Sequence, residues 1–505
     1  MPDEDLPDAL SDGGSADAGT DQARNLGDAA ARGVSVVLAT QALRVALQFG
    51  SVVLLARLLT PEDFGLVAMV TAVIGIAEII RDAGLSSAAV QAAQLSEDER
   101  TNLFWANLGL GTACALVIVA SEPLIVAGYG EPRIGPIIYS LAFVFMISGA
   151  NTQYRSDMMR RLKFRQLSTS ELSAQFLAIV TAVSLALAGA GLWAIVAQQI
   201  VTAAATFLIN VANLRWNPGL PKRGVSLRRF FRFGFGVLGT HGLAYLTKSA
   251  ANVAIGAHLG PAPLGLFNRA YQLLMTPLQQ IDAPMTSVAL PVLSRVQDDD
   301  ERFSRYLAKT QLVACYGTSV LLAVAAGVAH PLVLVLFGPD WIGVVPIFVV
   351  LAIGGIFRTL STIAYWIFLA RGRTGAQLRM DLFARPVMIA LMVGGLPWGV
   401  TGVAVGHGIA FFLYWLLAFV NVQRVTGVDV RPLFVTAVRT ATLVSAPCGL
   451  VAWGLASWLH VWPFFEVVAG VLGAGVYLLL AAAMLPIVRH DLVEAVRIGR
   501  RALKR

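Results

Sequence analysis

The sequence of 505 residues contains few charged residues, few cysteines and few histidines, and each shortage excludes a class of protein. Only 13% of the residues are charged and 57% are hydrophobic, whereas soluble domains carry about 25% charged and about 45–50% apolar residues. Cys114, Cys315 and Cys448 each lie inside an apolar run and form no CxxC pair, so neither a disulfide framework nor a zinc site is expected. The six histidines are scattered. We therefore predict a membrane protein without a cofactor or a metal site.

Enzyme motifs are also missing. The sequence contains no GxxxxGK(S/T) loop for nucleotide phosphates, no HExxH pair and no GxSxG turn. A membrane-embedded glycosyl polymerase or ligase would need a sizeable outer loop with charged catalytic residues, but the outer loops expected here are short and nearly uncharged. We predict that the protein is not an enzyme.

Charge is distributed unevenly along the chain. Eight of the 30 acidic residues lie in residues 1–32, which are rich in Gly, Ala and Ser and lack the features of a secretory signal, so we predict a disordered acidic cytosolic tail. Over the rest of the chain 36 Lys and Arg residues outnumber 22 Asp and Glu residues, and the net charge of the whole chain is +8. These basic residues lie in short loops between apolar runs, a pattern typical of the positive-inside rule rather than of nucleic-acid binding.

Fourteen segments are long and apolar enough to cross a membrane, because a spanning helix needs roughly 20 apolar residues. If both termini are cytosolic, the tails and inner loops hold 30 of the 38 Lys and Arg residues, and the outer segments keep only Arg57 and Arg133. The predicted helices cover residues 33–57, 64–91, 103–121, 134–153, 170–189, 191–213, 231–258, 264–290, 309–331, 343–370, 376–395, 398–423, 433–458 and 463–487.

An internal repeat relates two parts of the chain at an offset of 200 residues. Segments 57–91 and 257–291 share eight identical residues in 35 aligned positions. A second, shorter region of similarity at an offset of 208 residues aligns Gly130 with Gly338. Parallel repeats of this kind form two lobes around a central site with alternating access. We predict an acidic tail (1–32), an N-lobe (33–228), a C-lobe (229–425), a two-helix appendage (426–487) and a basic cytosolic tail (488–505).

Ionisable residues inside the predicted helices are the main functional signal. A cation at mid-bilayer costs about 2.5–3.5 kcal/mol on insertion scales, so such residues must face water, protein or an anion. Helical spacing groups polar residues into stripes on the first, seventh and eighth helices, and we expect these helices and the second to line one cavity. The residues predicted to bind substrate there are Arg44, Arg81, Lys248, Arg269, Arg358, Gln41, Gln48, His241, Tyr245, Asn252 and Gln272.

Some of these residues also have a structural explanation. Arg81 lies next to Asp82, with Glu78 one turn earlier, so the three would equally form an ion-pair cluster. Arg269 would also reach the outer interface by snorkelling. Arg44 and Lys248 have no acid nearby in the sequence, which favours a cavity role. The carboxylates predicted to couple transport to a cation, either H⁺ or Na⁺, are Glu78, Asp82 and Asp282.

The predicted cavity holds more cations than carboxylates, which indicates an anionic cargo. A phosphate or pyrophosphate fits, because Lys and Arg donate charge-assisted hydrogen bonds to its oxygens. At the cytosolic face the basic amphipathic segments 155–165, 222–232 and 487–505 are typical of chains that lie on anionic membrane lipids. They are equally well explained as determinants of topology.

Four motifs carry a resemblance to a known family: ARLLTPEDFGLVAMV (56–70), FNRAYQL (267–273), PVLSRVQDD (291–299) and VLFGPDW (335–341). They resemble the Wzx-type oligosaccharide flippases, in particular the colanic-acid-exporter-like branch of the polysaccharide transporter family in the MOP superfamily, over about residues 33–487. The resemblance implies an all-α polytopic membrane protein of the MATE type. Such a protein would have about 14 transmembrane helices. Twelve of them would form two parallel six-helix repeats, arranged as V-shaped lobes, and the last two would follow at the C-terminus.

The same resemblance implies a function. The protein would flip polyprenyl-pyrophosphate-linked oligosaccharide across the cytoplasmic membrane for lipopolysaccharide or exopolysaccharide biosynthesis, with polymerase or glycosyltransferase machinery as partners. Two alternatives share the fold: a peptidoglycan-precursor (lipid II) flippase, which differs only in cargo, and a MATE-like drug/cation antiporter, which the cationic bias disfavours.

Overall fold

The computed structural model describes residues 41–81, 95–225 and 249–503, together with residues 227, 230, 245 and 247. Within these residues the chain is helical and contains no β-strand. The predicted acidic tail and parts of the first, second and seventh predicted helices lie outside the described residues.

The helices of the first half are Gln41–Leu58, α2 (Pro61–Arg81), α4 (Glu97–Ala120), α5 (Glu122–Tyr129), α6 (Ile134–Arg160), α7 (Phe164–Leu187) and α8 (Trp193–Leu214). Those of the second half are a helix over 249–259, α10 (Pro261–Arg295), α11 (Asp300–Ala314), α12 (Val320–Gly327), α13 (Ala329–Leu336), α14 (Val344–Ala370), α15 (Thr374–Gly394) and α16 (Gly399–Thr426). The last helices are α17 (Arg431–Thr440), α18 (Ala446–Trp458), α19 (Pro463–Met484) and α20 (Pro486–Leu503). Single π-helical turns join α11 to α12 and α17 to α18.

Local sequence explains where several helices begin and end. Ser96 and Glu99 form a capping box at the start of α4, in which each side chain accepts the backbone N–H of the other residue at 3.1 Å. Pro61 and Pro261 occupy the first positions of α2 and α10, where a missing N–H costs no helical hydrogen bond. Gly130 ends α5 in the left-handed conformation that glycine adopts without strain.

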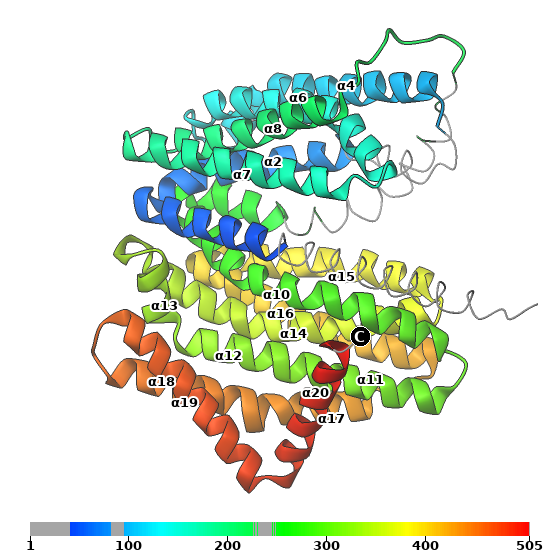
Figure 1. Ribbon diagram of the computed structural model, residues 1–505. Coiled ribbons are helices and arrows are strands. Elements are labelled where there is room, and N and C mark those ends of the chain that lie inside the picture. The colour runs from blue at the N-terminus through cyan, green and yellow to red at the C-terminus, as the bar shows by residue number, and fades with distance from the viewer. Residues whose placement is uncertain are drawn as a thin grey trace, which may run out of the picture.

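The long helices form two bundles, and a further group packs on the second (Figure 1). The N-terminal bundle contains helix 41–58, α2 and α4–α8, and the C-terminal bundle contains helix 249–259 and α10–α16. In the first, α4 packs on α6 and α7 on α8; in the second, α14 packs on both α10 and α16. The two bundles meet chiefly where α2 packs against α10.

The contact between α2 and α10 is reciprocal. A Cβ atom on Gly65 would overlap with the carbonyl group of Pro261, and a Cβ atom on Gly265 would overlap with the carbonyl group of Pro61. Both positions therefore require glycine for the two backbones to approach this closely. The four residues are two of the matched pairs of the 200-residue repeat.

Further contacts join the bundles at the same end of the molecule. Arg57 donates hydrogen bonds to the carbonyl oxygens of Val335 and Leu336 at the end of α13. The buried Trp341 donates from Nε1 to the carbonyl oxygen of Ala56 at 2.7 Å, and its ring packs edge-on against Phe64. The described structure is therefore held together across the bundles at the end where α2 and α10 begin.

Helices α17–α20 pack against the C-terminal bundle, with α18 on α12, α19 on α13 and α20 on α11. Asp491 of α20 is only 6% exposed, and its Oδ2 atom accepts hydrogen bonds from Arg439 at 2.5 Å and from the Tyr316 hydroxyl at 3.3 Å. A buried carboxylate is tolerated when it is paired in this way. Most of the segment predicted as a basic tail (488–505) thus lies in a helix anchored to the bundle.

Each of the fourteen predicted segments overlaps a helix in the described part of the chain, but the boundaries differ. For example, α6 continues to Arg160, seven residues beyond the predicted end, because polar residues in its last turns are paired: Asp157 accepts from Arg100 at 2.5 Å. By length and composition, ten helical stretches among the described residues are able to cross a membrane, one of which combines α15 and α16. The protein is a multi-pass, all-helical membrane protein.

Candidate functional site

A cavity of about 750 Å³ lies between the two bundles and extends into the C-terminal bundle. Its walls come from helix 41–58, α2 and α8 on one side and from helix 249–259, α10, α14, α15 and α16 on the other. This volume lies within the range of roughly 300–1,000 Å³ that is typical of small-molecule sites. The cavity is the candidate functional site.

The inter-bundle part of the cavity is the region where α10 faces the N-terminal bundle. Arg269 is its central cation: the guanidinium lies 3.7 Å from the centre of the Phe64 ring, and one NH₂ group donates to Gln272 Oε1 at 2.6 Å. The residues that we assign to the inter-bundle part are Gln48, Phe64, Thr71, Gln199, Arg269 and Gln272.

No carboxylate among the described residues lies within 4.0 Å of the Arg269 guanidinium, and its Nε atom is buried without a hydrogen-bond partner. A partly buried cation without a carboxylate partner is costly inside a membrane protein, so such a group usually serves a function or binds an anion. Among the arginines of the described cavity lining, Arg269 is therefore the one without a carboxylate partner.

The C-bundle part of the cavity is aromatic and polar. The Tyr271 and His407 rings lie 5.8 Å apart, His407 and Phe411 4.8 Å apart, and Phe411 and Tyr414 6.5 Å apart, measured between ring centres. The residues that we assign to the C-bundle part are Tyr271, Arg358, Arg385, His407, Phe411 and Tyr414.

Two ion pairs balance the charge of the C-bundle part. Arg358 of α14 pairs with Asp282 of α10 at 3.3 Å, and Arg385 of α15 pairs with Asp381 of the same helix at 3.4 Å. The Tyr414 hydroxyl donates to Asp381 Oδ1 at 2.7 Å, which holds that carboxylate in place. The two parts of the cavity thus differ in charge: one contains an unpaired cation and the other contains paired ions.

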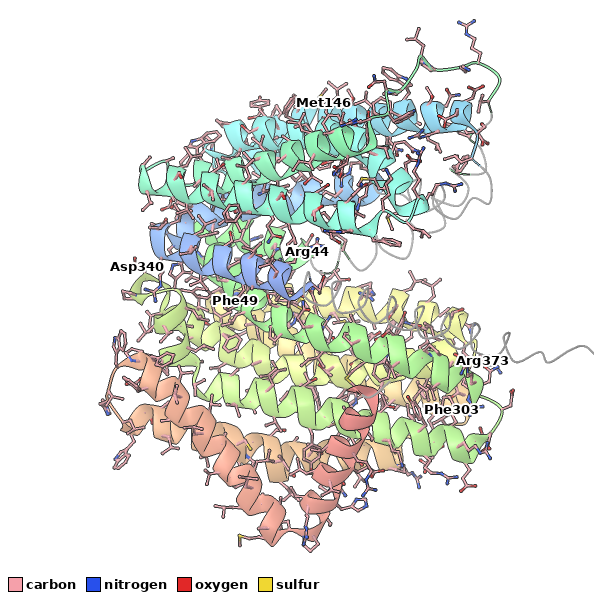
Figure 2. All side chains as sticks on the ribbon, viewed as in Figure 1. Arg44, Phe49, Met146, Phe303, Asp340 and Arg373 are labelled. Atoms are coloured by element: carbon pink, nitrogen blue, oxygen red, sulfur yellow. The ribbon has the colours of Figure 1, made fainter. Side chains whose placement is uncertain are left out.

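Five of the residues predicted to bind substrate line the cavity: Gln48, Asn252, Arg269, Gln272 and Arg358. Arg44 lies outside the lining, on helix 41–58 of the N-terminal bundle (Figure 2), and pairs with Glu171 of α7 at 2.9 Å. This carboxylate is 127 residues away in the sequence, which is why local sequence gave no sign of it.

The other predicted residues are placed as follows. The Tyr245 hydroxyl donates to the backbone carbonyls of Thr71 and Ala72 on α2, so it joins the bundles rather than lining the cavity. Gln41, Glu78 and Arg81 are also outside the lining, and Arg81 lies 5.4 Å from the centre of the Phe145 ring. Asp282 is paired with Arg358. Lys248, His241 and Asp82 lie outside the described residues.

Three residues of the cavity are absent from the set predicted by sequence: Arg385, His407 and Tyr414. Arg385 falls inside the predicted helix 376–395 but is not among the predicted site residues; α15 begins at Thr374, so Arg385 lies about three turns inside the helix. The spacing of Asp381 and Arg385, four residues apart, is the signal that would have identified an intrahelical pair. His407 is a single histidine in an apolar helix, and such a residue has no distinctive pattern in sequence.

Comparison with known proteins gives consistent matches. Residues 54–346 match the family described as "Polysaccharide biosynthesis protein". The chain is 25% identical over 382 residues to the lipopolysaccharide biosynthesis protein WzxC of Escherichia coli K12, covering 75% of this chain and 77% of that protein. It is 32% identical over 328 residues to the succinoglycan biosynthesis transport protein ExoT of Rhizobium meliloti, covering 63% and 64%.

Solved structures show the same fold at low identity. The lipid II flippase MurJ in an inward closed conformation superposes with a TM-score of 0.66 at 14% identity, covering 87% of this chain and 96% of that one. An inward-facing MATE transporter of the MOP superfamily superposes with a TM-score of 0.58 at 15% identity, covering 75% and 94%. The family match over residues 54–346 spans more than half of the chain and includes α2, α10 and the cavity residue Arg269. The chain therefore belongs to the polysaccharide biosynthesis protein family.

Proposed function

We propose that the protein moves polyprenyl-pyrophosphate-linked oligosaccharide units across the cytoplasmic membrane for cell-surface polysaccharide biosynthesis. Family membership and relatives named for lipopolysaccharide biosynthesis and succinoglycan transport support this function. The single observation that carries the choice of cargo is Arg269, a partly buried cation that lines the cavity without a carboxylate partner among the described residues. A pyrophosphate supplies the acceptor oxygens that this guanidinium lacks.

In this proposal two six-helix lobes (33–228 and 229–425) rock about the contact between α2 and α10, and residues 426–487 are an appendage. The reciprocal packing of Gly65 on Pro261 and of Gly265 on Pro61 supports equivalent roles for the two helices. Alternating access requires that the cargo bind the two states with different affinities. The polar and aromatic cavity walls bind the glycan, and the prenyl chain stays in the lipid.

The proposed topology has both termini in the cytosol. The labelled residues Arg373 and Phe303 lie at the opposite end of the molecule from Asp340 (Figure 2). The first two adjoin segments predicted to be cytosolic, and Asp340 adjoins a segment predicted to be outside, so their separation supports placing these segments on opposite sides of the membrane, and the loop charges set the proposed orientation. Polysaccharide polymerase or glycosyltransferase machinery would act on the same cargo before or after transport.

The main alternative is a MATE-like drug/cation antiporter, whose cargo would be cationic. An unpaired arginine in the cavity disfavours such a cargo, because like charges repel in a site of low dielectric constant. A lipid II flippase also carries a pyrophosphate, and the likeness to MurJ concerns the fold alone.

The cargo is tested by native mass spectrometry of the protein purified in mild detergent from its own host. We expect a copurifying polyprenyl-pyrophosphate saccharide with the wild type, loss of that lipid with Arg269→Ala, and its retention with Arg302→Ala, a 74% exposed arginine used as a matched control. If the wild type carries only ordinary phospholipid, the proposed cargo is wrong, and dye-efflux assays would then test the antiporter.

We further propose that Asp282 couples transport to a cation gradient, H⁺ or Na⁺, with Glu78 and Asp82 as the other candidates. Asp282 lies on α10 and pairs with Arg358 of α14, so a change in its charge would alter the interaction between two cavity helices. We expect Asp282→Asn to abolish the response of transport to an imposed H⁺ or Na⁺ gradient in proteoliposomes. Glu301→Gln, at an 85% exposed carboxylate, is the control. An unchanged response in Asp282→Asn would exclude this role.

A further inference from the structure

Helix α10 separates the two parts of the cavity. Arg269 and Tyr271 are two residues apart, which places their side chains about 200° apart around a helix of 3.6 residues per turn. Arg269 accordingly faces Phe64 of α2, whereas the Tyr271 ring packs edge-on against His407 of α16. Both residues line the same cavity, so one ligand is able to occupy both sides of α10.

The charges in the C-bundle part are already compensated among the described residues. Arg358 and Arg385 each have a carboxylate within 3.4 Å, so a further anion there would approach Asp282 and Asp381. By contrast, Arg269 has no such partner. By charge, the inter-bundle part therefore favours the pyrophosphate of the cargo, and the C-bundle part favours an uncharged group.

Two nitrogen atoms in the C-bundle part lack hydrogen-bond partners. His407 is only 5% exposed, and its Nε2 atom has no partner; the Nε atom of Arg385 is also buried and unpartnered. Both residues line the cavity. A purely apolar ligand would leave these nitrogens unpaired, whereas a hydroxyl group both donates and accepts and is able to pair with either one.

The remaining wall of this part is aromatic. Tyr271 and Phe411 flank His407, with ring centres 5.8 and 4.8 Å from the imidazole, and Tyr414 lies beyond Phe411, with its ring centre 6.5 Å from that of Phe411. A pyranose ring has an apolar face of C–H groups and a rim of hydroxyl groups. It matches a site that combines aromatic surface with a few convergent polar atoms.

We propose that the C-bundle part of the cavity is a subsite for an uncharged sugar residue of the cargo, whose ring contacts the aromatic side chains and whose hydroxyl groups pair with His407 and Arg385. This inference rests on the proposed function and specifies which chemical part of the cargo each side of α10 binds.

The test compares three probes with purified protein in detergent: undecaprenyl pyrophosphate alone, the same lipid carrying one uncharged hexose, and the same lipid carrying one hexuronic acid. We expect the hexose to improve wild-type affinity about tenfold, as one or two hydrogen bonds would, and the hexuronic acid to give a smaller gain or none. His407→Phe should lose most of the gain. His407→Gln, which keeps polar groups, should retain part of it.

The outcomes separate this inference from the proposed function. If the bare lipid binds but the hexose gives no gain, or if His407→Phe and His407→Gln both keep the full gain, the subsite is wrong and the flippase function stands. If the hexuronic acid binds most tightly, the assignment of an uncharged sugar is wrong. If none of the three probes binds to the wild type, the proposed function and the subsite are both overturned.

Discussion

Replacing Arg269 with methionine is expected to make the protein more stable and to weaken cargo binding. The substitution removes a partly buried cation without a carboxylate partner among the described residues, which should stabilise the folded protein by about 1–3 kcal/mol. It also removes a charge-assisted hydrogen bond to the pyrophosphate, which should lower the affinity for undecaprenyl pyrophosphate about 10- to 100-fold. The measurements are the unfolding temperature in detergent and a binding titration.

The opposite signs of these two effects distinguish a binding residue from a structural one. If Arg269 mainly stabilised the contact with Phe64, its loss would lower the unfolding temperature and leave lipid binding unchanged. Arg269→Lys keeps the charge but not the planar donor group, so it should bind the lipid with intermediate affinity. Arg302→Met, at an exposed arginine, should change neither measurement.

Placing alanine at Gly65 or Gly265 is expected to disrupt the junction between the two bundles. Each new Cβ atom would overlap with a backbone carbonyl of the opposite helix, so α2 and α10 would have to separate. We expect each substitution to destabilise the protein by about 1–3 kcal/mol, the cost typical of overpacking, and to reduce transport. Unfolding temperature and transport in proteoliposomes are the measurements.

A matched control and a double variant make this prediction specific. Gly109→Ala, in the interior of α4, places its Cβ atom more than 4 Å from any other group, so it should be neutral or stabilise by about 0.5–1 kcal/mol. Since one separation of the helices relieves both overlaps, Gly65→Ala/Gly265→Ala should cost less than the sum of the single variants. Single variants as stable as Gly109→Ala, or strictly additive costs, would contradict a shared reciprocal contact.

The sequence by itself predicted the class of protein, because hydrophobic length and the distribution of loop charges depend on the bilayer and not on how the helices pack. Each of the fourteen predicted segments overlaps a helix in the described part of the chain. The 200-residue repeat also identified Gly65 and Gly265 as an equivalent pair, although only the structure shows that each of them lies against the proline of the other helix.

The tertiary structure decided which ionisable residues are paired. Helical spacing determines which side chains share a face, but the partner across the contact comes from a helix far away in the chain. Arg44 has no acid nearby in the sequence, but it pairs with Glu171, 127 residues later. Arg269 was also open to explanation by snorkelling, yet it lines the cavity and has no carboxylate partner among the described residues. Arg385 and His407 line the cavity only because α15 and α16 pack beside α14 and α10. Sequence could predict that the helices contain cations, but the packing of distant helices determines which of those cations remains available for an anion.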